Sequence, residues 1–262
     1  LDGSKFISAA IRFDQDPWKI LTDGLGKDIT EVIPLGTILT LPATGSEMNS
    51  GGVISRSELG EKRIFGGPKL FPQFSILNPN VIQSLPKRQI ANGLADSFVH
   101  VMEQYLTYPS GAALTDRLAE SILSTIIEIA PKMMGDNPSY QCRSNFMWCC
   151  TMALNGLIGK GVPTDWATHL IGHELTALYG IDHGRTLAII APNLYTVMIS
   201  EKSEKLTQYG KRVWGLEGDA IDKEAIEKTR SFFHSINIDT KISDYTNNTD
   251  SLIETVQLKF KE

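Results

Sequence analysis

The hydrophobic pattern of the chain changes near residue 84, and this change limits the folds that the sequence can adopt. Before it, short apolar runs such as residues 33–42 and 73–79 alternate with turn residues, which is typical of buried strands joined by loops. A helix is expected over residues 2–11, and from residue 84 onward helix follows helix. The pattern predicts an α/β portion over residues 1–83 and an all-helical domain over residues 84–262.

The helical domain opens with signals for a helix start. Ser84 can cap the helix, Pro86 suits its first turn, and Ile90 and Leu94 begin an apolar row at near-helical spacing. A second helix, which Pro131 closes, is predicted from a core-facing stripe of Leu114, Leu118, Ile122 and Ile126. Further helices are predicted over residues 145–158, 165–179 (with Thr164 as N-cap and Gly180 after its last turn), 186–200 and 223–235.

Composition excludes several classes of function. The 262 residues carry 25 Lys+Arg against 30 Asp+Glu, and this balance, without basic runs, argues against nucleic acid or anionic membrane as a partner. No apolar stretch reaches the roughly 18 residues of a transmembrane helix, and no secretory signal pattern is present, so we expect a soluble, cytoplasmic protein. The three cysteines form no CxxC pair, which argues against a disulfide framework or a thiolate zinc site.

Histidines and one aspartate supply the candidate chemistry. Asp96 and His100 lie four residues apart, so on a helix they share a face, about 6 Å apart along the axis. That geometry can chelate a cation. Taken alone, however, such a pair is more often a local hydrogen bond on a helix surface. His234 lies in an amphipathic segment and is expected to be structural.

A second polar group strengthens the metal-site hypothesis. His169 and His173 repeat the four-residue spacing, and His183 follows just past the expected helix end, among apolar residues such as Trp166 and Leu170. Buried imidazoles need partners. One carboxylate with two or three imidazoles is a suitable ligand set for Zn²⁺ or Fe²⁺, so metal binding is favoured. Spacing alone does not separate His169 from His173 as a ligand.

Several better-known motifs are absent. His173-Glu174 is not followed by the second His of a zincin HExxH motif, which argues against a metalloprotease. The segment at residues 159–161 lacks the first Gly and the Ser/Thr of a P-loop. The glycine pairs at residues 51–52 and 66–67 are predicted to be ordinary turns.

Three segments together resemble the iron-containing (group III) alcohol dehydrogenase family. Residues 41–49, LPATGSEMN, resemble its TxGSE segment, and residues 92–100 with Glu103 resemble its GxxDxxxHxxE segment. Residues 161–169, continuing to His183, resemble the His-rich signature of the NADPH-dependent, butanol-dehydrogenase-like aldehyde reductase branch. The resemblance covers nearly the whole chain. It implies a partial dinucleotide-binding α/β domain followed by a helical metal-binding domain, the fold shared with dehydroquinate synthase.

The resemblance also implies roles for individual residues. The metal ligands would be Asp96, His100, His169 and His183, and His173 would face the nicotinamide and substrate as a catalytic residue without ligating. Cofactor contacts would come from Asp2, Lys5, Thr40, Thr44, Asn49 and Lys62. Without the family, the threonines would be interpreted as turn caps, Asn49 as a turn residue, and the two lysines as solvated surface charges.

The activity implied is hydride transfer between a nicotinamide cofactor and an aldehyde or primary alcohol. One divalent metal, Fe²⁺ or Zn²⁺, and NADP(H), with NAD possible, would be the cofactors, and the full-length enzyme is expected to be a homodimer. In the family a GGGS loop precedes the segment that matches residues 1–5, so the resemblance implies that this chain is an internal piece of the enzyme. Asn78-Pro79 stands where the family has Asp-Pro.

Two other functions stay open at this point. One is a metal-dependent lyase of the dehydroquinate-synthase-like group, whose site is rich in Lys and Arg. The apolar residues Trp166, Leu170 and Leu178 near the motifs fit a neutral aldehyde better. The other is a metal-binding module without catalytic turnover.

Overall fold

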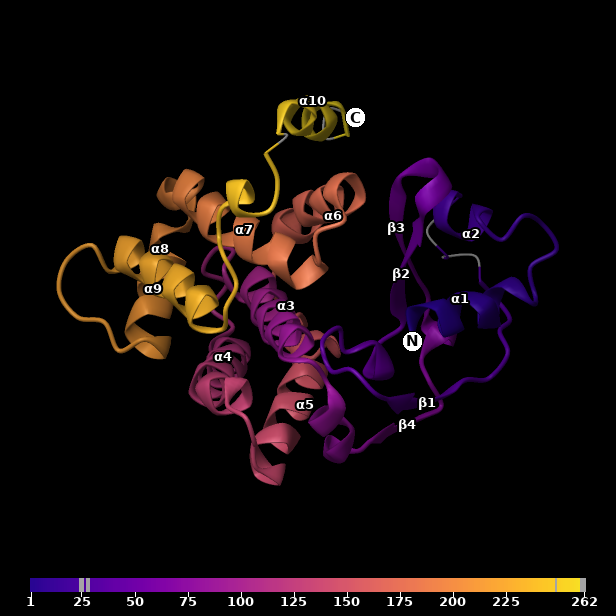
Figure 1. Ribbon diagram of the computed structural model, residues 1–262, viewed down its shortest axis with the longest axis horizontal. Helices are drawn as coiled ribbons and strands as arrows, with labels where there is room; N and C mark the ends of the chain where they lie inside the picture. The colour runs from indigo at the N-terminus through magenta and orange to yellow at the C-terminus, as the bar shows by residue number, and fades with distance from the viewer. Residues whose placement is uncertain (24–25, 27–28, 248, 260–262) are drawn as a thin grey trace.

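The computed structural model describes residues 1–23, 26, 29–247 and 249–259, and its chain forms an α/β part followed by a helical part (Figure 1). The α/β part contains helices α1 (Asp2–Ala10) and α2 (Lys19–Thr22) and strands β1 (Gly36–Leu39), β2 (Gly51–Arg56), β3 (Glu61–Gly66) and β4 (Phe74–Leu77). Short 3₁₀ helices lie between these elements: η1 (Ser46–Met48), η2 (Ser57–Leu59), η3 (Pro68–Leu70) and η4 (Pro79–Ser84).

The described strands form two small sheets. β1 pairs in parallel with β4, with Thr37 opposite Ser75, and their hydroxyls lie 2.7 Å apart. The apolar side chains of Ile38, Phe74 and Ile76 are 48–62% exposed, so these strands are buried on one face only and not fully buried as predicted. The alternation of side chains along a strand explains the difference, because only one face meets the core.

β2 and β3 form an antiparallel hairpin that the sequence did not predict. Gly51 pairs with Gly66, so Gly51, Gly52 and Gly66, three of the four glycines predicted to form turns, lie in paired strands instead. A Cβ on Gly52 would lie 2.8 Å from the ring of Phe65 and 3.2 Å from the Cβ of Asp2. The missing side chain therefore lets α1 pack closely against the hairpin.

The helical part surrounds one central helix, α3, against which most of the other helices pack (Figure 1). Its elements are α3 (Lys87–Tyr105), α4 (Ala113–Met134), α5 (Tyr140–Leu154), α6 (Ala167–Tyr179), α7 (His183–Val197), α8 (Ile199–Val213), α9 (Ile221–Ser235), η5 (Ile242–Asp244) and α10 (Asp250–Lys259). Among the described helices, none has both the length and the apolar composition needed to cross a bilayer.

Burial of α3 organises the core. Leu94, Phe98 and Met102 are completely buried in one large hydrophobic cluster, each contributing on the order of 1.5–3 kcal/mol by leaving water. The polar side chains of Asp96 and His100 are buried with them. Because a buried polar group requires a partner, these residues must find one inside the protein.

The predicted core stripe of α4 is wrong in its first half. Leu114 is 74% exposed and Leu118 is also exposed, whereas Leu123 and Ile126 are fully buried. Residues four apart on a helix are rotated by about 40° from one another, so a row at this spacing turns away from the core. Pro131 lies inside the last turn and does not close the helix.

Other helix ends differ from the prediction. α5 begins earlier, because the Ser139 side chain accepts a hydrogen bond from the backbone N–H of Cys142 and caps it. α6 begins at Ala167, capped by the Asp165 carboxylate and not by Thr164, and Gly180 in the left-handed conformation follows its last residue as predicted. α7 begins at its His residue, three positions before the predicted start, and α8 was not predicted.

We expect Gly184→Ala to destabilise the protein by about 1–3 kcal/mol, as overpacking typically does. A Cβ at this position of α7 would lie 2.5 Å from the carbonyl oxygen of Asn92 on α3, and backbone cannot move aside cheaply. Thermal unfolding measures the effect. Gly3→Ala in α1 is the control, because its Cβ would meet no atom within 4 Å and alanine favours a helix. Equal melting temperatures for Gly184→Ala and wild type would contradict the close packing of α7 on α3.

Candidate metal centre

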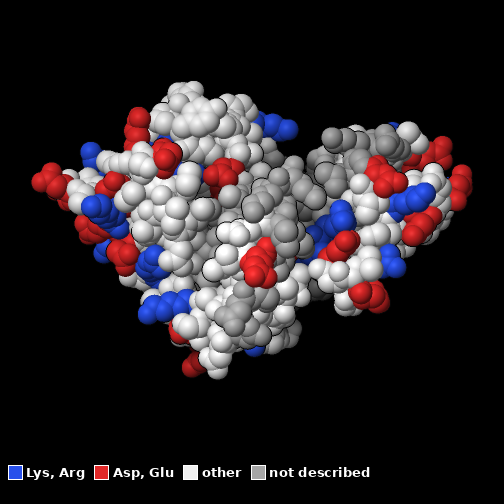
Figure 2. Space-filling model, turned by 90° about the horizontal axis from the view of Figure 1, so that it is seen from above, with Lys and Arg blue, Asp and Glu red and all other residues white. Residues whose placement is uncertain are grey.

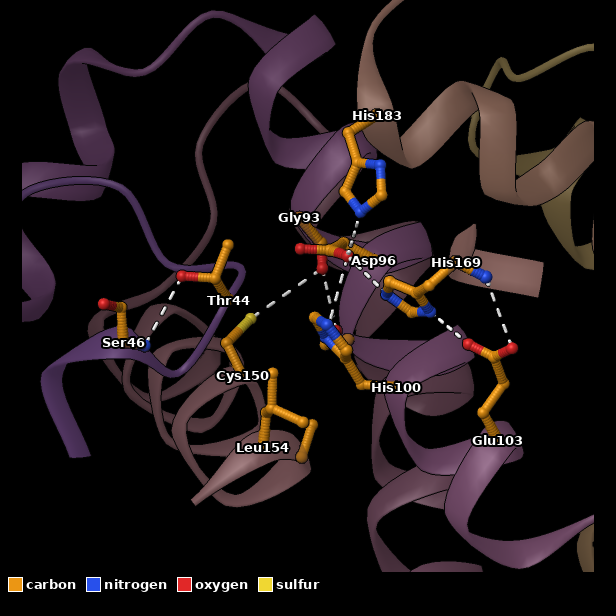
Figure 3. A network of polar contacts seen from close by, with 12 residues as sticks. Thr44, Ser46, Gly93, Asp96, His100, Glu103, Cys150, Leu154, His169 and His183 are labelled. Carbon is orange, nitrogen blue, oxygen red and sulfur yellow. Dashed lines mark hydrogen bonds and ion pairs between the residues drawn. The ribbon is translucent and has the colours of Figure 1, made fainter. Parts of the chain in front are cut away.

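The carboxylate of Asp96 lies at the focus of three imidazole rings (Figure 3). Its Oδ1 is 3.6 Å from His100 Nδ1, 3.6 Å from His169 Nε2 and 3.8 Å from His183 Nε2. These separations are too long for hydrogen bonds. They approach the spacing of about 3.4 Å between neighbouring ligand atoms that bind one tetrahedral ion at about 2.1 Å.

The facing atoms lack other partners. Asp96 Oδ1, His100 Nδ1 and His169 Nε2 are buried without a hydrogen-bond partner among the residues that the structure describes. Such orphaned atoms are rare in proteins and need an explanation, for which a bound cation is the simplest. The donor chemistry, nitrogen with one carboxylate, suits a borderline divalent ion.

Three of the four predicted ligands form the tightest group. The ligand atoms of Asp96, His169 and His183 all lie within 4.8 Å of one another. His100 lies beside this group, and its ring stacks on that of His169 with centroids 4.5 Å apart. The structure thus brings all four predicted ligands together, with His100 at the edge.

Three helices supply these side chains. Asp96 and His100 come from one face of α3, and His169 comes from the first turn of α6. His183 is the first residue of α7, and the preceding Asp182 accepts a hydrogen bond of 2.8 Å from the Asn92 side chain of α3. The loop before α7 is therefore held against the helix that carries Asp96.

Burial and mutual charge shift the pKa values at this centre. Burial alone would raise the pKa of Asp96, but the facing imidazoles hold it well below its usual range. Burial lowers the pKa of His100 to about 4 and that of His183 far below its usual value. Burial also acts to lower the pKa of His169, yet Asp96 and Glu103 together raise it to about 9. His100 and His183 are therefore neutral at pH 7, the form that can bind a metal.

Glu103 has a role that the sequence did not reveal. One carboxylate oxygen contacts Nδ1 of His169, and the other accepts hydrogen bonds from the backbone N–H groups of Thr168 (2.6 Å) and His169 (3.3 Å). A carboxylate on one ring nitrogen fixes the histidine tautomer and turns the other nitrogen to the metal. The sequence feature that could have indicated this role is the position of Glu103, seven residues after Asp96 and so on the same face of α3.

His173 lies next to the candidate ligands but outside the tightest group. Its ring centroid is 4.9 Å from that of His183 and 6.3 Å from that of His169. Burial, helped by the positive charge of Lys62, lowers the pKa of His173 to about 3, so the imidazole is neutral at pH 7. A neutral imidazole has one donor and one acceptor nitrogen, which suits proton transfer.

Lys62 links the α/β part to the metal centre. It lies on β3, and burial lowers its pKa while the carboxylates of Asp96 and Asp2 act in the opposite direction. Its positive charge also lowers the pKa values of His173 and His183. In the space-filling view, a furrow separates the two parts, with basic side chains on its α/β side (Figure 2).

The other predicted cofactor residues fall into two groups. Lys5 is completely buried, and its ammonium donates to both oxygens of Asn49 and to the carbonyl of Gly51, at 2.8–2.9 Å. Its three N–H groups are all used, so it holds the loop before β2 and is neither a surface charge nor a free donor. Thr40 and Thr44, by contrast, are exposed.

Asp2 and Asn49 also make contacts within the protein. The Asp2 carboxylate accepts a hydrogen bond of 2.9 Å from the backbone N–H of Val53. The Asn49 side chain accepts from Gly51 N–H (3.1 Å) and donates to the carbonyl of Leu154 on α5 (3.2 Å). Asn49 thus ties the α/β part to the helical part.

Comparison with known families decides the relationship. Residues 1–79 match the family described as iron-containing alcohol dehydrogenase, and residues 90–262 match the Fe-containing alcohol dehydrogenase family, C-terminal. The chain belongs to the iron-containing alcohol dehydrogenase family. The family predicted from the three sequence segments is therefore confirmed.

Similar members of the iron-containing alcohol dehydrogenase family are known from several organisms. The NADPH-dependent aldehyde reductase YqhD of Escherichia coli is 50% identical over 250 residues, which are 94% of this chain and 64% of that protein. The probable NADH-dependent butanol dehydrogenase 1 of Bacillus subtilis is 39% identical over 257 residues, 96% of this chain and 66% of that protein. The chain thus spans about two thirds of the length of these relatives.

Solved structures agree with the fold. The crystal structure of E. coli YqhD superimposes with a TM-score of 0.94 at 48% identity, covering 98% of this chain and 67% of that one. For NADH-dependent butanol dehydrogenase A of Thermotoga maritima the TM-score is 0.89 at 28% identity, covering 98% and 65%. The predicted combination of a small α/β part and a helical part is confirmed as the family fold.

We expect Glu103→Gln to weaken metal binding by about 10- to 100-fold, the usual effect of removing a carboxylate behind a ligating histidine. The amide keeps the shape of the side chain but loses the charge that orients His169. Competition with a chromophoric chelator measures the zinc affinity. The control is Glu120→Gln, which changes a buried glutamate of α4 bonded to Tyr105 and Arg212. Unchanged affinity in Glu103→Gln would contradict the role given to this residue.

Proposed function

We propose that the intact protein is a metal-dependent, NAD(P)H-linked alcohol dehydrogenase that reduces aldehydes to primary alcohols and catalyses the reverse reaction. The observation that carries the proposal is the group of three imidazole nitrogens within 3.8 Å of one buried carboxylate oxygen. The names of the relatives, an aldehyde reductase and a butanol dehydrogenase, support the same activity.

Asp96, His100, His169 and His183 are the proposed ligands of one divalent metal, Fe²⁺ or Zn²⁺. The orphaned, buried atoms of Asp96, His100 and His169 fit such an ion. When bound, the ion supplies Lewis acidity to a carbonyl oxygen. The protein's own contribution is to hold the ligands in place through Glu103 and through the packing of α6 and α7 on α3.

His173 is the proposed proton carrier. Because its pKa is lowered to about 3, it is neutral at pH 7 and holds a proton on one ring nitrogen only. Reduction of an aldehyde requires one proton at the substrate oxygen. Neutral His173 can donate its ring N–H proton to that atom while its other ring nitrogen accepts a proton from solvent. Nearby, Trp166 meets the rings of His100 and His169 edge-on, with centroids 6.3 and 5.5 Å away.

The proposed hydride carrier is NADP(H), with NAD(H) as the alternative. The nicotinamide ring supplies the hydride, and the chain supplies alignment. NADPH is preferred because the relative at 50% identity is NADPH-dependent, although the relative at 39% is NADH-dependent. Thr40, Thr44 and Lys62 are the proposed contacts, whereas Asp2, Lys5 and Asn49 act through the loops that they hold.

A neutral aldehyde fits the surroundings of the candidate site better than a phosphorylated substrate. Trp166 meets two of the histidine rings, and with Leu170 and Ile171 it also lines a mainly apolar hollow between α6 and α10. Family membership supports the alcohol dehydrogenase over the dehydroquinate-synthase-like lyase. We also propose, from the family resemblance, that the full-length enzyme is a cytoplasmic homodimer.

Elemental analysis by plasma mass spectrometry tests the metal site. We expect about one zinc or iron ion per chain in the wild type, the stoichiometry of a single mononuclear site. We expect its loss in the His169→Ala, His183→Ala double variant. The control is His234→Ala, which removes a histidine of α9 whose ring contacts the Thr240 hydroxyl and none of the proposed ligands. Metal-free, folded wild-type protein after reconstitution with Zn²⁺ or Fe²⁺ would contradict the metal-site proposal.

Nicotinamide fluorescence tests the cofactor proposal and separates the enzyme from a metal-binding module. We expect NADPH emission to change on adding the protein, and the change to weaken in Lys62→Ala, because Lys62 faces the centre from the α/β part. Lys69→Ala in η3 is the matched surface control. With the full-length enzyme, consumption of NADPH should require an aldehyde such as butanal. Metal binding without any NADPH response or turnover would favour the module.

A further inference from the structure

A buried lysine of α8 reaches the segment that carries a proposed metal ligand. Lys202 is 7% exposed, and its ammonium donates to the carbonyl of Leu106, at the end of α3, and to Asp165 Oδ2, at 2.8 and 2.9 Å. A buried ammonium requires such acceptors, since leaving it unpaired is costly. Lys202 therefore ties the end of α3 to the residues just before α6.

Asp165 connects Lys202 to the first turn of α6. Its second carboxylate oxygen accepts a hydrogen bond of 3.1 Å from the backbone N–H of Ala167, the first residue of that helix. Its own backbone N–H donates to the carbonyl oxygen of Glu103, at 2.9 Å. One residue thus joins Lys202, the start of α6 and the backbone of α3.

The contacts of Glu103 make the metal centre sensitive to the position of that turn. Its carboxylate binds the backbone N–H groups of Thr168 and His169 as well as the His169 ring. A displacement of the first turn of α6 therefore alters the backbone and ring contacts together. The ring nitrogen that faces Asp96 would move with them.

Little room for water remains beside these contacts. The space enclosed by Glu103, Asp165, Thr168, Tyr195 and Lys202 is about 10 Å³, which is about the room that one water molecule needs. Loss of the lysine would therefore leave the Leu106 carbonyl with at most one water molecule as a partner, and would leave Asp165, whose side chain is 39% exposed, without the ammonium that holds it toward α3. The position of Asp165, and with it the start of α6, therefore depends on the side chain of Lys202.

We propose that Lys202 is a positioning residue for the metal centre. Through Asp165 it fixes the first turn of α6 on Glu103, and so directs Nε2 of His169 toward Asp96. This inference rests on the proposed metal-binding function. It assigns to α8, which supplies no ligand, a specific effect on metal affinity.

The neighbouring lysine of α8 provides a matched control. Lys205 is 3% exposed, and its ammonium lies 2.9 Å from Asp116 on α4 and 3.9 Å from the centroid of the Tyr105 ring. Its contacts resemble those of Lys202 in kind. They do not include the start of α6, so a general loss of stability can be told from a positioning effect.

The experiment compares Lys202→Met with Lys205→Met in zinc affinity, by chelator competition, and in melting temperature. Both variants are expected to melt at lower temperature than the wild type. Only Lys202→Met is expected to bind zinc more weakly, by about tenfold, the lower end of the effect of residues behind a ligand. Should Lys202→Met fail to fold, Asp165→Asn replaces it, because the amide keeps the cap on Ala167 but weakens the bond to Lys202.

Each outcome decides one point. Wild-type zinc affinity in a folded Lys202→Met or Asp165→Asn variant would overturn this inference and leave the proposed function standing. Equal weakening by Lys202→Met and Lys205→Met would overturn it too, because the effect would then follow stability. Wild-type protein that binds no zinc would overturn the proposed metal-binding function, and this inference with it.

Discussion

A carboxylate buried at the centre of the helical core is the constraint on which the structure around the site depends. Asp96 lies in the middle of α3, and its Oδ1 has no hydrogen-bond partner among the described residues. An uncompensated buried charge costs several kcal/mol. Three imidazoles from α3, α6 and α7 surround it instead of apolar side chains, and the divalent ion that we propose to bind there would compensate its charge.

The packing of the surrounding helices follows from this centre. α7 packs so closely on α3 that there is no room for a side chain at Gly184. This close packing places His183 beside Asp96. α6 is attached to α3 through Glu103, which contacts both the His169 ring and the helix backbone. The α/β part adds Lys62 from β3, whose charge reaches the same group. The residues proposed to contact the cofactor and those proposed to bind the metal therefore meet where the two parts join.

The family and its fold could be predicted because three short segments carry spacing that few other proteins share. Local spacing also placed Asp96 and His100 on one helix face. It did not distinguish His169 from His173, since the distinction depends on how α6 lies on α3. The burial of Lys5 could not be predicted for a similar reason. Its hydrogen-bond acceptors, Asn49 and Gly51, lie more than forty residues away in the sequence. The β2–β3 hairpin was missed because its glycines are typical of turns.

The most direct test of the central claim is anomalous diffraction at the zinc absorption edge, from crystals of the protein reconstituted with Zn²⁺. One anomalous peak is expected about 2.0–2.2 Å from an Asp96 oxygen and from Nε2 of His169 and His183. The electron density of the same crystals shows whether the His100 ring is oriented as the fourth ligand. A peak bound elsewhere, or a well-ordered Asp96 with no peak beside it, would contradict the account.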